Sequence, residues 1–117
     1  MIKYCENLPK VELHAHLNGS LSLDTLRDLG LDLQVELIDL KDFFKLFPQI
    51  YSMIDTKDKI KEICSKTIQE FKKDSVIYLE LRSTPRSSPR MTMGEYVEGL
   101  VESTQYLTGN SYYCAHL

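Results

Sequence analysis

The sequence predicts an α/β fold that opens with two parallel strands joined by helices. Residues 10–16 alternate apolar and polar side chains, which is the period-two pattern of a strand. Residues 57–73 carry apolar side chains at i, i+3, i+4 and i+7, which is typical of an amphipathic helix. Residues 76–83 are apolar for most of their length, as in a strand covered on both faces. A helical crossover between two strands makes them parallel and the connection right-handed.

The elements before the long helix are short. Residues 1–9 are a lead-in, and the first strand runs from residue 10 to residue 14 or 16. Ser22 is an N-cap candidate for a helix that Gly30 ends. Residues 31–40 give no firm assignment beyond a loop.

A second helical stretch covers residues 41–54 and contains Pro48. Proline removes a helix hydrogen bond, so we expect a kink or two short helices there. Three phenylalanines, Phe43, Phe44 and Phe47, lie on one side of this stretch. We interpret them as part of the core in preference to a substrate pocket.

The elements after the long helix are a strand, a loop and a helix. Two prolines and two serines exclude regular structure from residues 84–90. Thr92 and Glu95 form a capping box that opens a helix reaching to about residue 107. Two parallel strands alone cannot cover both their faces, so the pattern predicts the opening of a larger α/β fold. We expect a domain part over residues 1–104 and a divergent tail over 105–117, which stops where a third strand would follow.

The composition is that of a globular protein from a reducing compartment. The chain has 117 residues, of which 43% are hydrophobic and 26% charged, and a formal net charge of −3. No basic field is therefore available for binding nucleic acid. No apolar run is long enough for a transmembrane helix, and residues 1–6 lack the apolar core of a signal peptide. Three scattered cysteines argue against a disulfide framework. We expect a cytoplasmic protein that binds neither nucleic acid nor membrane.

His14 and His16 form a candidate metal site. They share one face of the first strand, with their side chains roughly 6–7 Å apart at the base. A turn over residues 18–20 follows, so the pair sits at the C-terminal tip of the strand, where α/β proteins place ligands. Imidazole suits zinc, copper, iron or nickel, but catalytic zinc needs three or more protein ligands. Two ordinary histidines near a strand end remain the alternative, and we do not expect His116 in the tail to be a ligand.

The loop after the second strand is a candidate anion site. Ser83, Thr84, Pro85 and Arg86 leave that strand at the same end as the histidines leave the first. Hydroxyls, backbone N–H groups and a guanidinium there suit a phosphate or a carboxylate. A polar loop with solvated arginines is the alternative interpretation.

Residues 9–20 and residues 78–86 together resemble one family. Pro-Lys-Val-Glu-Leu-His-Ala-His-Leu-Asn-Gly-Ser is similar to the opening metal motif of the adenosine/AMP deaminases. Tyr-Leu-Glu-Leu-Arg-Ser-Thr-Pro-Arg is similar to the second strand of that family and its following loop. The resemblance covers roughly residues 8–101 and implies a TIM (β/α)₈ barrel, of which the chain supplies about two of the eight strands. It also implies one Zn²⁺ at the C-terminal ends of the strands.

The resemblance carries over residue by residue. His14 and His16 match the first two zinc ligands. The residues that match or lie near nucleotide-binding positions are His16, Asn18, Tyr51, Ser83, Thr84, Pro85 and Arg86. Arg86 is our candidate for the phosphate, and Tyr51 lies near a position that is histidine in some relatives. Asn18 and the residue 83–86 loop resemble the branch that acts on N6-methyl-AMP.

The implied reaction is hydrolytic deamination at purine C6, which turns N6-methyl-AMP into IMP and methylamine. Zinc lowers the pKa of a water, and a glutamate acts as general acid and base. That glutamate, the third zinc histidine and the zinc-binding aspartate of the family have no match in these 117 residues. We therefore expect an N-terminal portion of a longer, monomeric enzyme, without a catalytic residue of its own and inactive alone.

Other functions remain open. The parent protein is alternatively an adenosine or AMP deaminase, or another metal-dependent hydrolase. The chain itself is alternatively a non-catalytic truncated product that binds a partner through its open strand edges.

Overall fold

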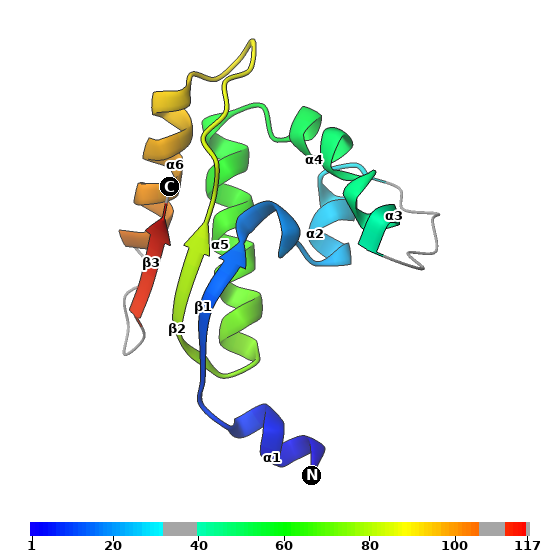
Figure 1. Cartoon of the computed structure of the whole chain (residues 1–117). Coiled ribbons are helices and arrows are strands. Elements are labelled where there is room, and N and C mark those ends of the chain that lie inside the picture. The colour runs from blue at the N-terminus through cyan, green and yellow to red at the C-terminus, as the bar shows by residue number, and fades with distance from the viewer. Residues whose placement is uncertain (32–39, 106–111, 117) are drawn as a thin grey trace.

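A three-stranded parallel sheet organises the chain. The computed structural model describes residues 1–31, 40–105 and 112–116. The strands are β1 (Lys10–His16), β2 (Val76–Arg82) and β3 (Tyr112–His116), in the spatial order β1-β2-β3. Both pairings are parallel, so the carboxyl ends of the three strands meet at one edge of the sheet (Figure 1). The predicted α/β class and the parallel strand pair are confirmed.

Strand β3 corrects the sequence interpretation, which found two strands and left the tail irregular. It pairs with β2 residue for residue, from Tyr78 opposite Tyr112 to Arg82 opposite His116. This pairing gives partners to the backbone N–H and C=O groups along one edge of β2. These hydrogen bonds join residues that are far apart in the sequence, so the side-chain pattern of residues 112–116 alone does not predict the strand. Residues 106–111 and the β3 side chains lie outside the described part of the chain.

Helices α5 (Lys57–Lys73) and α6 (Met93–Gln105) cover one face of the sheet (Figure 1). The apolar stripe of α5 is buried as predicted, with Ile60 and Ile63 both 0% exposed. Leu79 and Leu81 of β2 point into the same layer. The two helices approach closely at Gly99, where a Cβ atom would stand 3.1 Å from the Ile60 side chain. The hydrophobic core therefore lies between the sheet and this helix pair.

Three short helices lie beyond the carboxyl end of β1: α2 (Leu23–Asp28), α3 (Leu40–Phe44) and α4 (Phe47–Met53). The Ser22 side chain accepts a hydrogen bond from the Thr25 N–H, and Gly30 has a φ of 93°, so the predicted cap and stop of α2 are confirmed. Pro48 occupies the first turn of α4. It begins a helix there in place of breaking one, which gives the two short helices that its position predicted. Residues 32–39 lie outside the described residues.

Two further short helices, η1 and α1, flank strand β1. The 3₁₀ helix η1 (Leu17–Gly19) is the predicted turn after β1. Helix α1 (Ile2–Asn7) was not predicted, since none of its side chains is buried and it has no apolar periodicity. It extends from the amino end of β1 (Figure 1) and is tied to the α5–β2 turn by a 2.6 Å hydrogen bond from Ser75 Oγ to the Glu6 carbonyl.

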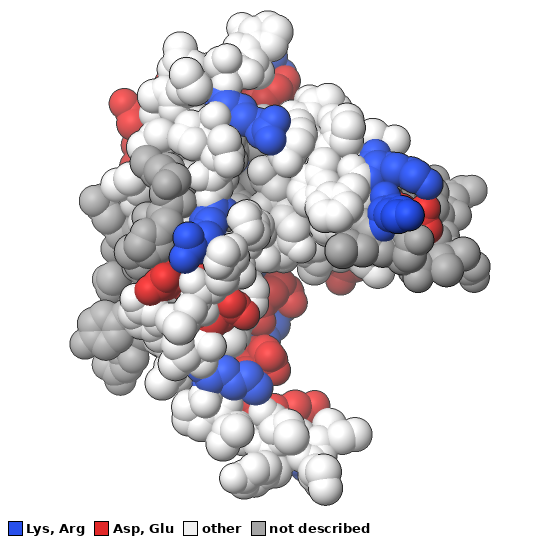
Figure 2. Space-filling view, viewed as in Figure 1, with Lys and Arg blue, Asp and Glu red and all other residues white. Residues whose placement is uncertain are grey.

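The face of the sheet opposite α5 carries polar side chains. They are His14 and His16 from β1, and Tyr78, Glu80 and Arg82 from β2. Acidic and basic groups alternate over the molecular face in Figure 2, without a continuous basic area among the described residues shown there. Within the described residues, no helix is long and apolar enough to cross a membrane.

Candidate functional site

The two histidines converge at the carboxyl end of β1. Their Nε2 atoms lie 3.1 Å apart, and the ring centroids are separated by 5.0 Å. At this distance either one imidazole donates a hydrogen bond to the other, or both lone pairs bind one cation. Zinc binds imidazole nitrogen at about 2.0–2.1 Å, so a 3.1 Å separation corresponds to an N–Zn–N angle of roughly 100°. That angle is close to tetrahedral, and the pair therefore fits two positions of a zinc coordination shell.

The backbone before the pair is held by Glu12. Its Oε1 atom accepts a 2.8 Å hydrogen bond from the His14 N–H. The predicted alternation from Glu12 to His16 is interrupted, because the pairing of β1 with β2 shifts register between Glu12 and Ala15. Glu12 therefore stands opposite buried Leu79, whereas His16 stands opposite Arg82. Among the described residues, no group of three or more His, Cys, Asp or Glu side chains is placed to hold a metal ion. The described residues thus provide a pair of ligands and not a closed shell.

A cavity of about 830 Å³ opens in front of the histidines. The predicted site residues that line it are His14, His16, Asn18, Tyr51, Ser83, Thr84 and Arg86. They come from β1, from η1, from α4 and from the loop after β2, so the topology brings together side chains that are far apart in the sequence. Pro85 is the one predicted site residue with a described side chain that does not line this cavity, and it lines the adjoining one.

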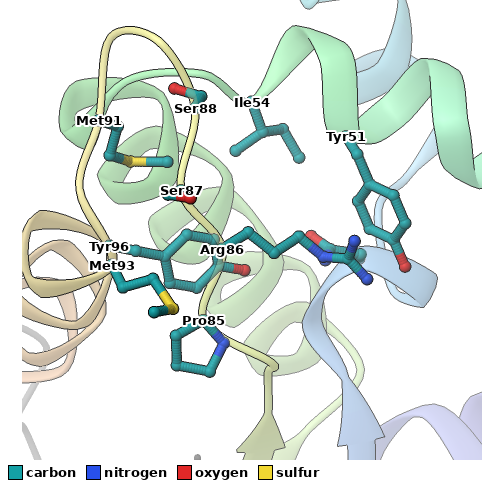
Figure 3. A pocket seen from close by; sticks show the side chains of 10 residues that line it. Tyr51, Ile54, Pro85, Arg86, Ser87, Ser88, Met91, Met93 and Tyr96 are labelled. Atoms are coloured by element: carbon teal, nitrogen blue, oxygen red, sulfur yellow. The ribbon is translucent and has the colours of Figure 1, made fainter.

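The adjoining cavity measures about 410 Å³ and shares Asn18, Tyr51 and Arg86 with the first. Figure 3 shows that the Arg86 side chain extends from its loop toward Tyr51 on α4. Ser87 and Ser88 give this second cavity polar groups, while Ile54, Met91, Met93 and Tyr96 give it an apolar and aromatic wall. Arg86 therefore stands at the junction of an imidazole-bearing cavity and a hydroxyl-bearing one.

The phenylalanine cluster, which the sequence interpretation assigned to the core, is only partly there: Phe43 packs against the core, but all three rings also face a cavity. Phe43, Phe44 and Phe47 line the larger cavity, and Phe44 is 57% exposed. Phe47 packs edge-on against Phe43 with centroids 5.3 Å apart and stacks on Phe44 at 5.7 Å. Since α3 and α4 lie beyond the strand ends and not against the sheet face, their aromatic side faces the cavity. These rings form an apolar wall of the cavity that also contains the polar strand tips.

The loop after β2 is anchored at its start by Tyr96. This tyrosine is 2% exposed, and its hydroxyl shares a 2.6 Å hydrogen bond with Ser83 Oγ. The capping box predicted for α6 is confirmed, with the Thr92 N–H donating to Glu95 at 2.7 Å and the Glu95 N–H donating to Thr92 Oγ1 at 3.2 Å. The start of α6 is thereby fixed, and with it the tyrosine that holds the loop.

Asp55 anchors the far end of the same loop. Ser88 Oγ donates to the Asp55 carbonyl at 2.8 Å, and the Arg90 guanidinium lies 3.3 Å from the Asp55 carboxylate. The hydrogen bond from Lys59, together with the charges of Lys59 and Arg90, lowers the pKa of the Asp55 carboxyl below its ordinary value. Arg86 lies between these two anchors.

Two buried polar atoms at the site have no hydrogen-bond partner among the described residues. They are Oδ1 of Asn18 and Nε of Arg82. Both residues line the larger cavity. Buried polar atoms are nearly always paired in folded proteins, so these two are the groups for which a ligand or an ordered water is expected.

Sequence reasoning missed several residues at the site. The phenylalanine wall, Tyr96 and Arg82 were given structural interpretations or none. One sequence feature could have identified Arg82 as a site residue: it directly precedes Ser83, the first residue of the predicted anion-binding loop. For the phenylalanines, apolar periodicity is the same for a core helix and for the wall of a cavity.

The chain resembles curated proteins of one kind. It is 42% identical over 115 residues to N6-Methyl-AMP deaminase-L of Xenopus laevis and 40% identical over 114 residues to N6-Methyl-AMP deaminase of Homo sapiens. Those alignments cover 86% and 85% of this chain, but 33% and 32% of the relatives. The chain thus spans about a third of the length of the curated relatives it matches. No family model matches the sequence.

Solved structures agree with the sequence comparison. Arabidopsis ADAL complexed with IMP matches over 98% of this chain and 41% of its own, with a TM-score of 0.80 and 27% identity. The same protein complexed with GMP matches with a TM-score of 0.80 and 28% identity. An adenine deaminase from Arthrobacter aurescens, at 18% identity and a TM-score of 0.72, shares the fold. The chain has the fold of the corresponding part of a TIM barrel.

Proposed function

We propose that the strand tips of this chain form the metal- and nucleotide-binding part of a purine aminohydrolase of the adenosine/AMP deaminase family, as its similarity to N6-methyl-AMP deaminases suggests. The observation that carries the proposal is the position of the His14–His16 pair and Arg86 on one cavity. The first suits a metal ion and the second a phosphate. The relatives named for N6-methyl-AMP and the related structure with bound IMP support a purine nucleotide as the ligand.

The metal of the proposal is zinc, held by Nε2 of His14 and Nε2 of His16. Their 3.1 Å separation and the neutral imidazole chemistry fit it, with further ligands supplied from outside the described residues. Zinc at this site would supply a Lewis acid, which lowers the pKa of a water molecule to about 7. The His14 N–H donates a hydrogen bond to the Glu12 carboxylate at the register shift of β1 between Glu12 and Ala15, and this bond supports the backbone that carries both rings.

The nucleotide lies across the strand tips in this proposal. The aromatic wall of Phe43, Phe44 and Phe47 excludes water from the purine, and Asn18 Oδ1 accepts a hydrogen bond from it. Hydrolysis adds a water oxygen to C6 and breaks the C6–N6 bond. The nitrogen takes a proton and leaves as methylamine, and the ring product is IMP. Among the described residues these groups bind and orient the substrate; the proton carrier is a glutamate for which this chain has no match.

The Arg86 guanidinium favours a nucleotide over a nucleoside. It reaches the junction of the two cavities, and among the described residues no carboxylate lies within ion-pair distance of it. Its charge therefore remains available to a phosphate, which a bidentate guanidinium contact recognises well. This observation ranks N6-methyl-AMP and AMP above adenosine as the substrate class.

We propose that the chain is cytoplasmic and that it is inactive alone. Binding therefore tests the proposal more directly than turnover does. We expect IMP to bind the zinc-loaded full chain more tightly than inosine does, and Arg86→Ala to abolish the difference. A charge-assisted hydrogen bond contributes about 1.5–3 kcal/mol, which is roughly a 10- to 150-fold preference. Isothermal titration calorimetry measures both ligands.

Arg27→Ala is the matched control, since Arg27 is an exposed arginine on α2 whose charge is already paired with Asp24. It should leave both affinities unchanged. Equal binding of IMP and inosine by the unsubstituted chain would contradict the nucleotide assignment. Rapid release of methylamine from N6-methyl-AMP by the isolated chain would contradict its inactivity.

A further inference from the structure

The side chains of Tyr51 and Arg86 form a contact that the proposed function does not yet use. We infer that Tyr51 is a positioning residue for Arg86: its ring holds the guanidinium at the junction of the two cavities, and its hydroxyl is dispensable. The inference rests on the proposed function, in which Arg86 receives the phosphate. It gives Tyr51 a role through another side chain and not through a direct contact with the nucleotide.

The geometry of the contact is that of a cation–π pair. Arg86 Cζ lies 3.5 Å from the centroid of the Tyr51 ring, well inside the limit of about 6 Å for such pairs. Figure 3 shows the guanidinium beside the face of this ring. The separation is a stacking distance, at which the planar guanidinium and the ring lie in van der Waals contact.

The Tyr51 ring is itself held in place. It packs on Phe47, one helical turn earlier in α4, with centroids 5.6 Å apart and ring planes inclined by 32°. Phe47 in turn contacts Phe43 and Phe44. Tyr51 is half-buried in this row, whereas Arg86 is exposed. The ring is thus the fixed member of the pair, and the arginine is the side chain that gains order from it.

The chemistry of the partner explains why a ring suits this place. Arg90, in the same loop, lies 3.3 Å from the Asp55 carboxylate, which neutralises its charge. A carboxylate beside Arg86 would compete with an incoming phosphate in the same way. An aromatic face attracts the guanidinium without neutralising it, so the arginine is oriented while its N–H groups stay available to an anion.

The hydroxyl of Tyr51 takes no part in this arrangement. Among the described residues it has no hydrogen-bond partner, although the ring makes both contacts given above. A substitution that keeps the ring should therefore preserve the function of Tyr51, and one that removes the ring should not. This difference separates positioning through the ring from a direct polar contact with the substrate.

The test compares Tyr51→Phe with Tyr51→Leu in the full chain, with Tyr4→Leu as the matched control on exposed helix α1. The first readout is the NMR resonance of the Arg86 Nε–H proton, which the ring current of a stacked ring shifts upfield. We expect the shift in the unsubstituted chain, in Tyr51→Phe and in Tyr4→Leu, and its loss in Tyr51→Leu. The same upfield position in Tyr51→Leu would overturn the inference.

The second readout is the affinity for IMP against inosine in the same variants. An exposed cation–π contact is worth about a two- to fivefold change in an equilibrium constant, so Tyr51→Leu should lower the ratio of the IMP affinity to the inosine affinity by that factor. Tyr51→Phe should retain the affinity of the unsubstituted chain. IMP affinity that depends on Arg86 but is unchanged in Tyr51→Leu, or lost in Tyr51→Phe, would overturn the inference. Failure of the unsubstituted chain to prefer IMP would count against the proposed function instead, and the NMR shift would still decide the contact.

Discussion

Removing the Tyr96 hydroxyl should loosen the loop that carries Ser83. Tyr96 is 2% exposed, and its Oη lies 2.6 Å from Ser83 Oγ, so Tyr96→Phe deletes a well-formed hydrogen bond without opening a cavity. A hydrogen bond between neutral groups contributes about 0.5–1.5 kcal/mol net. Ser83 is half-buried, and water can pair its hydroxyl once the partner is gone. We therefore expect a loss of about 1 kcal/mol in the free energy of unfolding.

The assay is urea denaturation of four proteins: the unsubstituted chain, Tyr96→Phe, Ser83→Ala and the double variant. If the two hydroxyls act through each other, each single substitution costs about 1 kcal/mol and the double variant costs about the same. The coupling energy of the cycle is then about 1 kcal/mol. Additive losses, agreeing within about 0.3 kcal/mol, would show that the hydrogen bond does not hold the loop and would refute the reasoning.

Three further predictions concern packing and protonation. Gly99→Ala should lower the free energy of unfolding by about 1 kcal/mol, because the added Cβ stands 3.1 Å from the Ile60 side chain of α5 and overpacking outweighs the gain in helix propensity. Gly94→Ala is the control, since its Cβ would stand 3.8 Å from the nearest atom, and urea denaturation should show no loss of stability for it. Hydrogen bonds from the backbone and side chain of Thr92 lower the pKa of Glu95. The ionised Glu95 therefore stabilises the fold above pH 4.5, and this stabilisation is lost as the pH falls through the lowered pKa. Glu95→Gln should make the melting temperature less dependent on pH in this acidic range. Burial raises the pKa of Cys64 to about 11, so mass-spectrometric mapping after alkylation at pH 8 should find Cys5 modified and Cys64 protected until unfolding.

Local signals predicted most of the described elements. The alternation over residues 10–16 placed both histidines on one face, and the structure puts their Nε2 atoms 3.1 Å apart. Ser22 and the Thr92–Glu95 pair marked helix starts, because a cap is read from side chains within one turn of the backbone N–H groups it satisfies. Pro48 separated two helices for an equally local reason.

Features that depend on distant parts of the chain were not predictable in the same way. Strand β3 exists because β2 offers it an unpaired edge, which a pattern in residues 112–116 does not contain. The phenylalanine wall has the periodicity of a core helix, and the position of α3 and α4 beyond the strand ends decides which it is. Tyr51 and Arg86 each had a predicted role, but the contact between them follows from the fold alone.

Metal binding by His14 and His16 tests the central claim most directly. Zn²⁺ titrated into the full chain at pH 7.5 should bind with a stoichiometry of one, and X-ray absorption should show imidazole nitrogens at about 2.0–2.1 Å. His14→Ala and His16→Ala should each abolish this site, because neither imidazole alone provides the converging pair. Zinc binding that survives both substitutions, or a first shell without imidazole nitrogen, would contradict the account.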